Sequence, residues 1–201
     1  MNQEQSPNSG KPSSEMTVLT LADRSDEELA QVAHEDHNVF AVLYRRHVTD
    51  VYRYLLMQVG KVHDAEDLTT QTFEAALQHI ASYQGIGKFK SWLLGIARRK
   101  AADHFRQQRA TLPLEFAKHI PYPGTSLDEC IEQQLCLEQV ASLLHLLTPE
   151  RSEALALRLF GCLTTAEVAH VMGKSEAAVK MLVHRAMSDL KQQLTNIQKE
   201  N

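Results

Sequence analysis

A stretch without helical periodicity divides this chain of 201 residues into two halves. It covers residues 110–125 and holds several prolines, which remove a backbone hydrogen bond and clash with the preceding turn of a helix. It contains Pro113, Pro121, Pro123 and Gly124. On both sides of it, apolar residues recur at steps of three and four, which indicates amphipathic helices. The sequence therefore predicts an all-α protein with two small helical domains, residues 25–109 and 126–201, joined by a flexible linker.

The N-terminus and the distribution of apolar residues restrict the class of protein further. Residues 1–24 are rich in Ser, Gln, Asn and Pro, so we expect a disordered tail. No run approaches the roughly 20 apolar residues that a membrane-spanning helix needs. The first residues also lack the apolar core of a secretory signal. We therefore expect a cytoplasmic protein that is not inserted into a membrane.

The three cysteines form no disulfide or metal pattern. Cys130 and Cys136 lie six residues apart in an expected helix. That places them about 9 Å apart on different faces, too far for a disulfide. No CxxC or HExxH spacing occurs, and the ten histidines are scattered. We expect no metal and no cofactor, and we expect the cysteines, Cys162 included, to be buried structural thiols.

Three helices are expected in the part of the first domain before residue 89. Ser25–Glu28, with the sequence SDEE, is a capping box that opens a short helix. A longer amphipathic helix includes Phe40 and ends at Gly60. Asp64 caps a third helix, whose acidic first turn suits the helix dipole. Its expected buried residues are Leu68, Phe73, Ala76, Leu77 and Ile80, and its exposed edge carries Asp64, Asp67 and Gln71.

The stretch from Phe89 to Arg109, FKSWLLGIARRKAADHFRQQR, combines an apolar face with a cationic one. Phe89, Leu93 and Ile96 share one stripe of a helix and should be buried. The cationic side holds Arg98, Arg99, Arg106 and Arg109, within about 100° of arc. Residues 88–109 carry seven Lys or Arg against one acid, a net charge of +6 in a chain whose total is −4. Such a stripe favours a polyanionic partner, first of all nucleic acid, while the alternative is a solvated basic face.

The second domain should open with two helices. Ser126–Glu129 is a second capping box, and the helix behind it stops at Thr148. Thr148 and Pro149 then cap and open the next helix, which Gly161 ends.

The last part of the chain has the pattern of a helix-turn-helix. One helix spans about 165–172, Gly173 forms the turn, and Ser175 caps the second helix. Small Ala169 lies where the helices cross, and Val168 and Val179 pack between the two helices. The outward residues of the second helix are Ala177, Lys180, Met181, His184 and Arg185. They would enter a major groove, and the alternative is an ordinary helical hairpin in a bundle.

Separated blocks of the chain together resemble one known family. The blocks are DAEDL…QTF (64–73), FKSWLLGIARRKAADHFR (89–106) and LTPERSEALALRLFGCLTTAEVAHVMGKSEAAVKMLVHRA (147–186). In order, spacing and linker they are similar to a bacterial RNA polymerase sigma factor of the extracytoplasmic-function (ECF) group of the sigma-70 family. That group keeps only the second and fourth sigma domains. The resemblance covers about residues 25–194 and implies a promoter-specificity subunit that binds core RNA polymerase and promoter DNA, commonly under the control of an anti-sigma factor.

The resemblance also implies a role for each block. The surface for the clamp coiled coil of the polymerase's largest subunit is matched by Asp64, Asp67, Leu68 and Gln71. The cationic helix and the glycine-containing loop before it match the part that opens the minus-ten element and holds an unstacked base. The residues of that part are Gln84, Gly85, Lys88, Lys90, Trp92, Arg98, Arg99 and Arg106. The reader of the minus-thirty-five element is matched by Ser175, Ala177, Lys180, Met181, His184 and Arg185.

The chain departs from the family pattern at several positions. Gln71 stands where Glu is usual, which weakens the acidic edge. Met181 and Leu182 stand where Ser and Arg are usual, and Lys174 replaces an apolar residue. Leu182 lies at the edge of the buried arc of its helix, and we expect it to be exposed. Binding to the upstream element should be weaker or differently selective than the family norm.

Two other functional classes compete with this interpretation. A stand-alone helix-turn-helix regulator would bind DNA without polymerase, but the first 110 residues look like no effector-sensing domain. An enzyme acting on nucleic acid would need a nucleophile or a metal. Asp64, Glu66 and Asp67 could be proposed as metal ligands, yet their place at a helix N-terminus already has a capping explanation. We therefore expect a protein that is not an enzyme.

Overall fold

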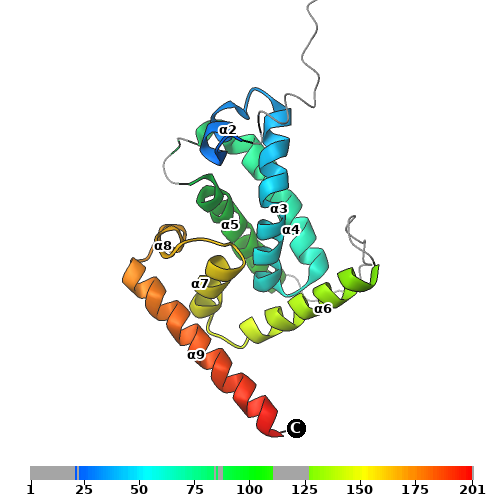
Figure 1. The fold of residues 1–201 in the computed structure, drawn as a ribbon, viewed down its shortest axis with the longest axis vertical. Helices are drawn as coiled ribbons and strands as arrows, with labels where there is room; N and C mark the ends of the chain where they lie inside the picture. The colour runs from blue at the N-terminus through cyan, green and yellow to red at the C-terminus, as the bar shows by residue number, and fades with distance from the viewer. Residues whose placement is uncertain (1–20, 22, 84, 86–87, 111–126, 201) are drawn as a thin grey trace, which may run out of the picture.

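The structure is a computed structural model that describes residues 21, 23–83, 85, 88–110 and 127–200. Within the helices, the side chains of residues 109–110, 127–135, 194 and 196–200 are outside this description. The described backbone forms helices and connecting turns, without a β-strand. The predicted all-α fold is confirmed (Figure 1). The predicted linker, the capping role of Ser126, and Gln84 lie outside the described residues.

Eight α-helices make up most of the described chain. The N-terminal half contains α2 (Asp26–Val32), α3 (His37–Val59), α4 (Val62–His79), the 3-10 turn η1 (Ile80–Ser82) and α5 (Phe89–Ala110). The C-terminal half contains α6 (Leu127–Leu144), α7 (Pro149–Leu159), α8 (Thr165–Met172) and α9 (Glu176–Glu200). None of the described helices is both long and apolar enough to cross a bilayer.

The ends of several helices follow from local chemistry. Ser25 forms the expected capping box with Glu28, and Gly60 ends α3 in the left-handed conformation, at φ 71°. Asp64 does not cap α4, which begins earlier, at Val62, so the carboxylate lies inside the first turn. Ordered packing also begins before Ser25, because Leu21 is buried.

The buried stripe of α4 differs from the predicted one at Leu77. Leu77 is 36% exposed, whereas Thr69 and Thr72 are buried. Both threonine hydroxyls donate to backbone carbonyls one turn earlier, at 2.7 Å, so each polar group is satisfied without solvent. The threonines therefore occupy the core side of α4 and turn Leu77 toward its edge.

The cysteine prediction is wrong for both cysteines whose side chains are described. Cys136 and Cys162 are exposed, and Cys130 lies outside the described side chains. Cys162 stands in the turn between α7 and α8 with φ 52°, where the chain passes over the surface. Among the described residues, no group of three His, Cys, Asp or Glu side chains is arranged to hold a metal ion.

The two halves pack against each other. Figure 1 shows α7 and α8 beside α5, and α6 crossing near the end of α3. Leu94 of α5 and Leu155 and Leu157 of α7 are fully buried and belong to one continuous apolar core. A continuous core across the halves means that the interface has definite side-chain packing.

Candidate nucleic-acid interface

An aromatic cluster fixes the start of α5. The ring of Trp92 lies 5.4 Å from that of Tyr83 and 5.5 Å from that of Phe89, between ring centres. The backbone N–H of Phe89 donates to Glu27 Oε1 at 3.2 Å, which satisfies one of the free donors at the helix start. Burial raises the pKa of Tyr83, with help from Glu27 and Asp26. Phe89, Leu93 and Ile96 are buried as predicted, so this face is held against the core while Lys88 remains exposed.

The cations of α5 have different environments. Lys90 is half-buried, and its Nζ lies 2.5 Å from Asp50 Oδ2 of α3. Arg106 pairs with Asp103 on its own helix. The exposed Arg99 donates from Nε to the carbonyl oxygen of Gly95 at 3.1 Å. The side chain of Arg109 is outside the description. The cationic stripe is therefore partly neutralised, and Lys90 is fixed within the N-terminal half.

Arg98 points at the C-terminal half. Its Nε lies 2.5 Å from Glu153 Oε1 of α7. The hydrogen bond to Glu153 raises the pKa of Arg98 above its ordinary value, although partial burial opposes the shift. Glu153 could not be identified from the sequence, because the pair joins residues far apart in the chain. The only sequence signal was the concentration of negative charge outside residues 88–109.

A cavity of about 260 Å³ lies between α5 and α8. It is lined by Lys88, which directly precedes α5, by Ser91, Trp92, Arg98 and Arg99 of α5, and by His170 of α8. A Cβ added at Gly95, also on its wall, would meet nothing within 4 Å. Four of the residues predicted to open DNA line this cavity, namely Lys88, Trp92, Arg98 and Arg99, and in this arrangement α8 faces them. Gly85, Lys90 and Arg106 are not among its lining residues.

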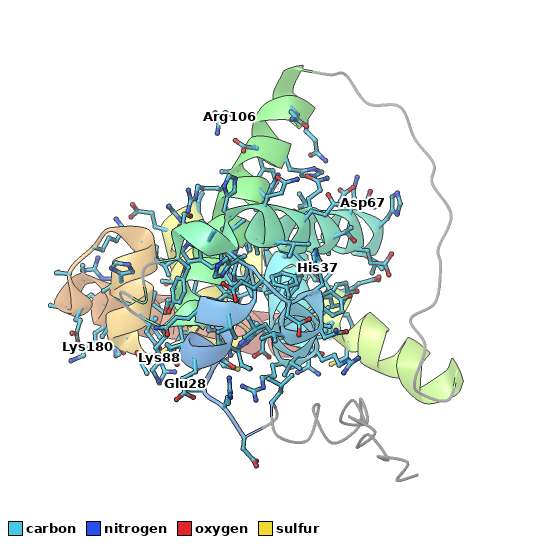
Figure 2. All side chains as sticks on the ribbon, turned by 90° about the horizontal axis from the view of Figure 1, so that it is seen from above. Glu28, His37, Asp67, Lys88, Arg106 and Lys180 are labelled. Atoms are coloured by element: carbon cyan, nitrogen blue, oxygen red, sulfur yellow. The ribbon has the colours of Figure 1, made fainter. Side chains whose placement is uncertain are left out.

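Four residues of α4 were predicted to bind the polymerase, and three of them lie at or near the surface. Asp67 and Gln71 are exposed. Asp64 is half-buried, and its Oδ2 lies 3.3 Å from His104 Nε2 of α5. Leu68 is only 3% exposed, so it supports this edge from beneath and its side chain is not a contact surface. Figure 2 shows Asp67 and Lys180 at opposite sides of the molecule.

The helix-turn-helix has the predicted local structure. Gly173 takes φ 64° between α8 and α9, and Ser175 Oγ accepts the N–H of Ala178 at 3.2 Å. Val168 and Val179 are fully buried between the helices. The predicted outward residues are all exposed: Ser175, Ala177, Lys180, Met181, His184 and Arg185.

The structure explains one departure from the family pattern and corrects an expectation about another. Lys174 Nζ donates to Glu150 Oε1 at 2.8 Å, so the lysine links the turn to the start of α7. Leu182 is half-buried and packs against the core, contrary to the expected exposure. Leu182 and Val183 are both half-buried, because α9 packs against α7 as well as α8 and its buried face is therefore wider than expected.

Two family descriptions match this chain. Sigma-70 region 2 matches residues 43–111, and Sigma-70 region 4 matches residues 137–190. The chain is 36% identical over 170 residues to the ECF RNA polymerase sigma factor BldN of Streptomyces coelicolor, an alignment covering 81% of this chain and 62% of BldN. The chain thus spans less than two thirds of the length of that relative.

Two further proteins extend the comparison. The chain is 31% identical over 149 residues to the ECF RNA polymerase sigma factor SigM of Bacillus subtilis, covering 74% of this chain and 91% of SigM. Its fold is similar to that of CnrH, solved in complex with the cytosolic domain of CnrY. The TM-score is 0.68 at 24% identity, over 86% of this chain and 99% of CnrH.

Proposed function

Because this chain belongs to the ECF RNA polymerase sigma factors of the sigma-70 family, we propose that it binds core RNA polymerase and directs transcription initiation at specific promoters. In this proposal α5 takes part in opening the minus-ten element, and the start of α9 reads the minus-thirty-five element. The two family matches favour this function over a stand-alone DNA-binding regulator, because that regulator would not need the sigma region 2 half.

The observation that carries the upstream assignment is the free outward face of α9. Its first turns leave Lys180, His184 and Arg185 exposed beside the exposed apolar side chain of Met181. Basic side chains on a helix in the major groove contact phosphates and guanine edges, and an apolar side chain fits the thymine methyl group. This face therefore supplies both positioning and base-reading contacts.

The start of α5 supports the role in opening. A base that leaves the duplex needs an aromatic or apolar surface, and its phosphates need cations. Trp92 lines a cavity together with Lys88 and Arg99, and Gly85 precedes them with φ 69°. These groups fit an unstacked base and its flanking phosphates.

The remaining proposals concern partners and location. Asp67 and Gln71 would contact a basic surface on the polymerase clamp, with Asp64 at the margin of this contact. Regulation by an anti-sigma factor is proposed from family membership. The protein would act without catalysis of its own, in the cytoplasm, where the polymerase is found.

Transcription in vitro tests the proposal. Core polymerase supplemented with the full chain should start transcripts at defined positions on genomic templates, and sequencing of the RNA 5′ ends would identify a shared promoter motif. The double variant Lys180→Ala/Arg185→Ala should lose most initiation while retaining core binding. Equal initiation by core enzyme alone would contradict the proposed function.

A further inference from the structure

Two acidic side chains of the C-terminal half face basic side chains at and just before α5. The closest contact joins Glu153 of α7 to Arg98 of α5, at 2.5 Å between Oε1 and Nε. The Glu153 side chain is 17% exposed and that of Arg98 is 40% exposed. The carboxylate therefore occupies the Nε edge of the Arg98 guanidinium, and a phosphate uses the same kind of charge-assisted hydrogen bond.

A second acid faces the start of α5. Glu167 Oε1 lies 3.9 Å from Lys88 Nζ, while Glu167 Oε2 accepts the backbone N–H of Thr164 at 2.6 Å and its hydroxyl at 2.7 Å. The capping box thus holds the carboxylate toward Lys88. Burial alone would raise the pKa of Glu167, but the bonds from Thr164, with Lys88 and Lys90 nearby, bring this pKa below its ordinary value. Glu167 therefore stays negative where it faces α5.

Apolar packing fixes these acids in position. A Cβ placed on Gly161, at the end of α7, would come 3.0 Å from Leu94 Cδ1 of α5. Such close approach of the backbone of one half to a buried leucine of the other sets their separation. Glu153 and Glu167 are thereby held over α5 from two different helices.

The upstream-reading face is left free in the same arrangement. Lys180, His184 and Arg185 are exposed on α9, whereas Arg98 is paired and Lys88 faces an acid. Figure 2 shows Lys88 and Lys180 on the same side of the molecule. In this arrangement, called closed below, acids of the C-terminal half face the proposed DNA surface of α5, whereas the proposed DNA surface of α9 remains exposed.

We propose that α7 and α8 act as an intramolecular substitute for DNA on the cationic helix. In the closed protein, Glu153 and Glu167 take the places of phosphates on Arg98 and Lys88, so closure and binding of the melted strand exclude each other. The upstream element can be engaged before the halves separate. This inference rests on the proposed role of α5 in holding melted DNA. Core polymerase or single-stranded DNA, which bind the open form better, would shift the population toward it.

Trp92 supplies a direct reporter of closure. It is the one tryptophan of the chain and lines the cavity between α5 and α8. Opening would expose its ring to acrylamide, a neutral quencher whose collisions do not depend on nearby charge. The same samples can be titrated with a single-stranded DNA oligonucleotide, so closure and DNA binding are measured independently.

The test variant is Glu153→Gln/Glu167→Gln in the full chain. Gln at the third position preserves a capping box, so α8 keeps its cap while the charge is lost. The matched control is Glu74→Gln/Glu150→Gln, which removes the same charge from two exposed residues. Glu74 lies on α4, and Glu150 pairs with Lys174 within the C-terminal half.

We expect quenching of Trp92 and affinity for the oligonucleotide to rise together in the test variant, by about two- to ten-fold, because each partly exposed pair shifts an equilibrium by up to about five-fold. In the unmodified protein, raising the salt concentration without DNA should increase quenching, and this salt effect should be smaller in the test variant. The control variant should behave like the unmodified protein.

Equal quenching in the test and control variants, together with salt-independent quenching of the unmodified protein, would show that Glu153 and Glu167 do not hold the two halves together. Increased quenching without a gain in oligonucleotide affinity would overturn the competition with DNA. The proposed role of α5 itself is judged separately, by transcription with holoenzyme carrying Arg99→Ala, a residue that neither acid contacts. Unchanged promoter opening there would remove the role of α5, whatever the quenching shows.

Discussion

The ring of His145 lies against the backbone of Gly60. A Cβ added at Gly60 would come 2.8 Å from His145 Cε1, and the glycine has φ 71°. His145 Nε2 also lies 3.0 Å from the carbonyl oxygen of Gln58, so the Nε2–H tautomer donates a hydrogen bond across the two halves. The end of α3 and the end of α6 are therefore joined by close packing as well as by a polar contact.

Gly60→Ala should destabilise the protein more than Gly173→Ala. Both glycines have positive φ, which costs a residue with a Cβ about 1 kcal/mol. Only Gly60 has a side chain in the way, since a Cβ at Gly173 would meet nothing within 4 Å. We expect a loss of roughly 2–3 kcal/mol for Gly60→Ala and roughly 1 kcal/mol for Gly173→Ala, measured by urea unfolding.

The double variant Gly60→Ala/His145→Ala isolates the steric part. Removing the ring should recover the excess loss of Gly60→Ala over Gly173→Ala, apart from the separately measured effect of His145→Ala. Equal losses for the two single glycine variants would contradict close packing between the halves at this site.

His47 should make the stability of the N-terminal half depend on pH. Its ring is buried, with Nε2 2.7 Å from Asp26 Oδ2, and burial lowers its pKa although Asp26 opposes the shift. Since the folded pKa is below that of the unfolded chain, near 6.5, stability is complete above about pH 6.5 and is lost as the pH falls through the folded pKa. We expect the melting temperature to fall on acidification from about pH 7.5 to about pH 5.5.

Comparison with His47→Gln identifies the responsible residue. Gln cannot titrate but can still donate to Asp26, so its melting temperature should fall less over the same pH range. A parallel decrease in both proteins would assign the pH dependence to other histidines.

Much of the local structure could be predicted because it depends on neighbouring residues. The capping box at Ser25, the left-handed Gly173 and the apolar stripe through Phe89 follow from short-range geometry and periodicity. The cap at Asp64 was misassigned because the backbone of Lys61 can begin the helix without a side-chain cap, so a good capping residue was not required.

The relations between the halves could not be predicted in the same way. Glu153 lies 55 residues from Arg98 in sequence, and no helical or turn periodicity connects them. Likewise, Leu68 fits both an exposed edge and a core stripe at its helical position, and only the packing of α3 against α4 decides between them. Long-range packing thus determines which members of the proposed surfaces are exposed.

Leu182→Arg should reduce the stability of the protein. Leu182 is half-buried against the core, so the substitution removes apolar contacts and places a charge at their edge, at a cost of roughly 1–3 kcal/mol. Its neighbour Met181 is 50% exposed and provides the matched control. Met181→Arg should change stability by less than about 0.5 kcal/mol, as is usual at exposed positions.

The two arginines should also differ in DNA binding. An exposed Arg at position 181 of α9 would add a phosphate contact, which steepens the salt dependence of binding by about one counterion. Loss of the apolar Met181 side chain should at the same time weaken the preference for thymine at the base that it faces. Thermal unfolding and binding to promoter duplexes at several salt concentrations measure both effects. A gain in affinity for Leu182→Arg without lower stability would show that its packing contributes little.

Arg99→Ala and Lys90→Ala should separate DNA contacts from structural pairs on the same helix. Arg99 is exposed, so its loss should slow promoter opening by the holoenzyme and reduce the salt slope by about one. A pre-melted template should partly restore initiation.

Lys90 is paired with Asp50, so its loss should mainly lower stability by leaving a half-buried carboxylate without its partner. Opening kinetics and thermal unfolding of both variants provide the comparison, and similar opening defects would place Lys90 on the DNA surface as well.

Asp67→Arg should weaken binding to core polymerase without affecting the fold. The Asp67 side chain is 59% exposed, and its Oδ2 lies 3.5 Å from Nε2 of His63, which is also exposed, on the same helix. Reversing one charge at a surface that meets a basic partner replaces attraction by repulsion, which should lower affinity by roughly ten-fold or more. Glu35→Arg makes the same charge change at an exposed residue between α2 and α3 and should leave affinity unchanged. Titration of labelled core enzyme would measure both constants. If Asp67→Arg binds as tightly as the Glu35 variant, the polymerase does not contact this part of α4.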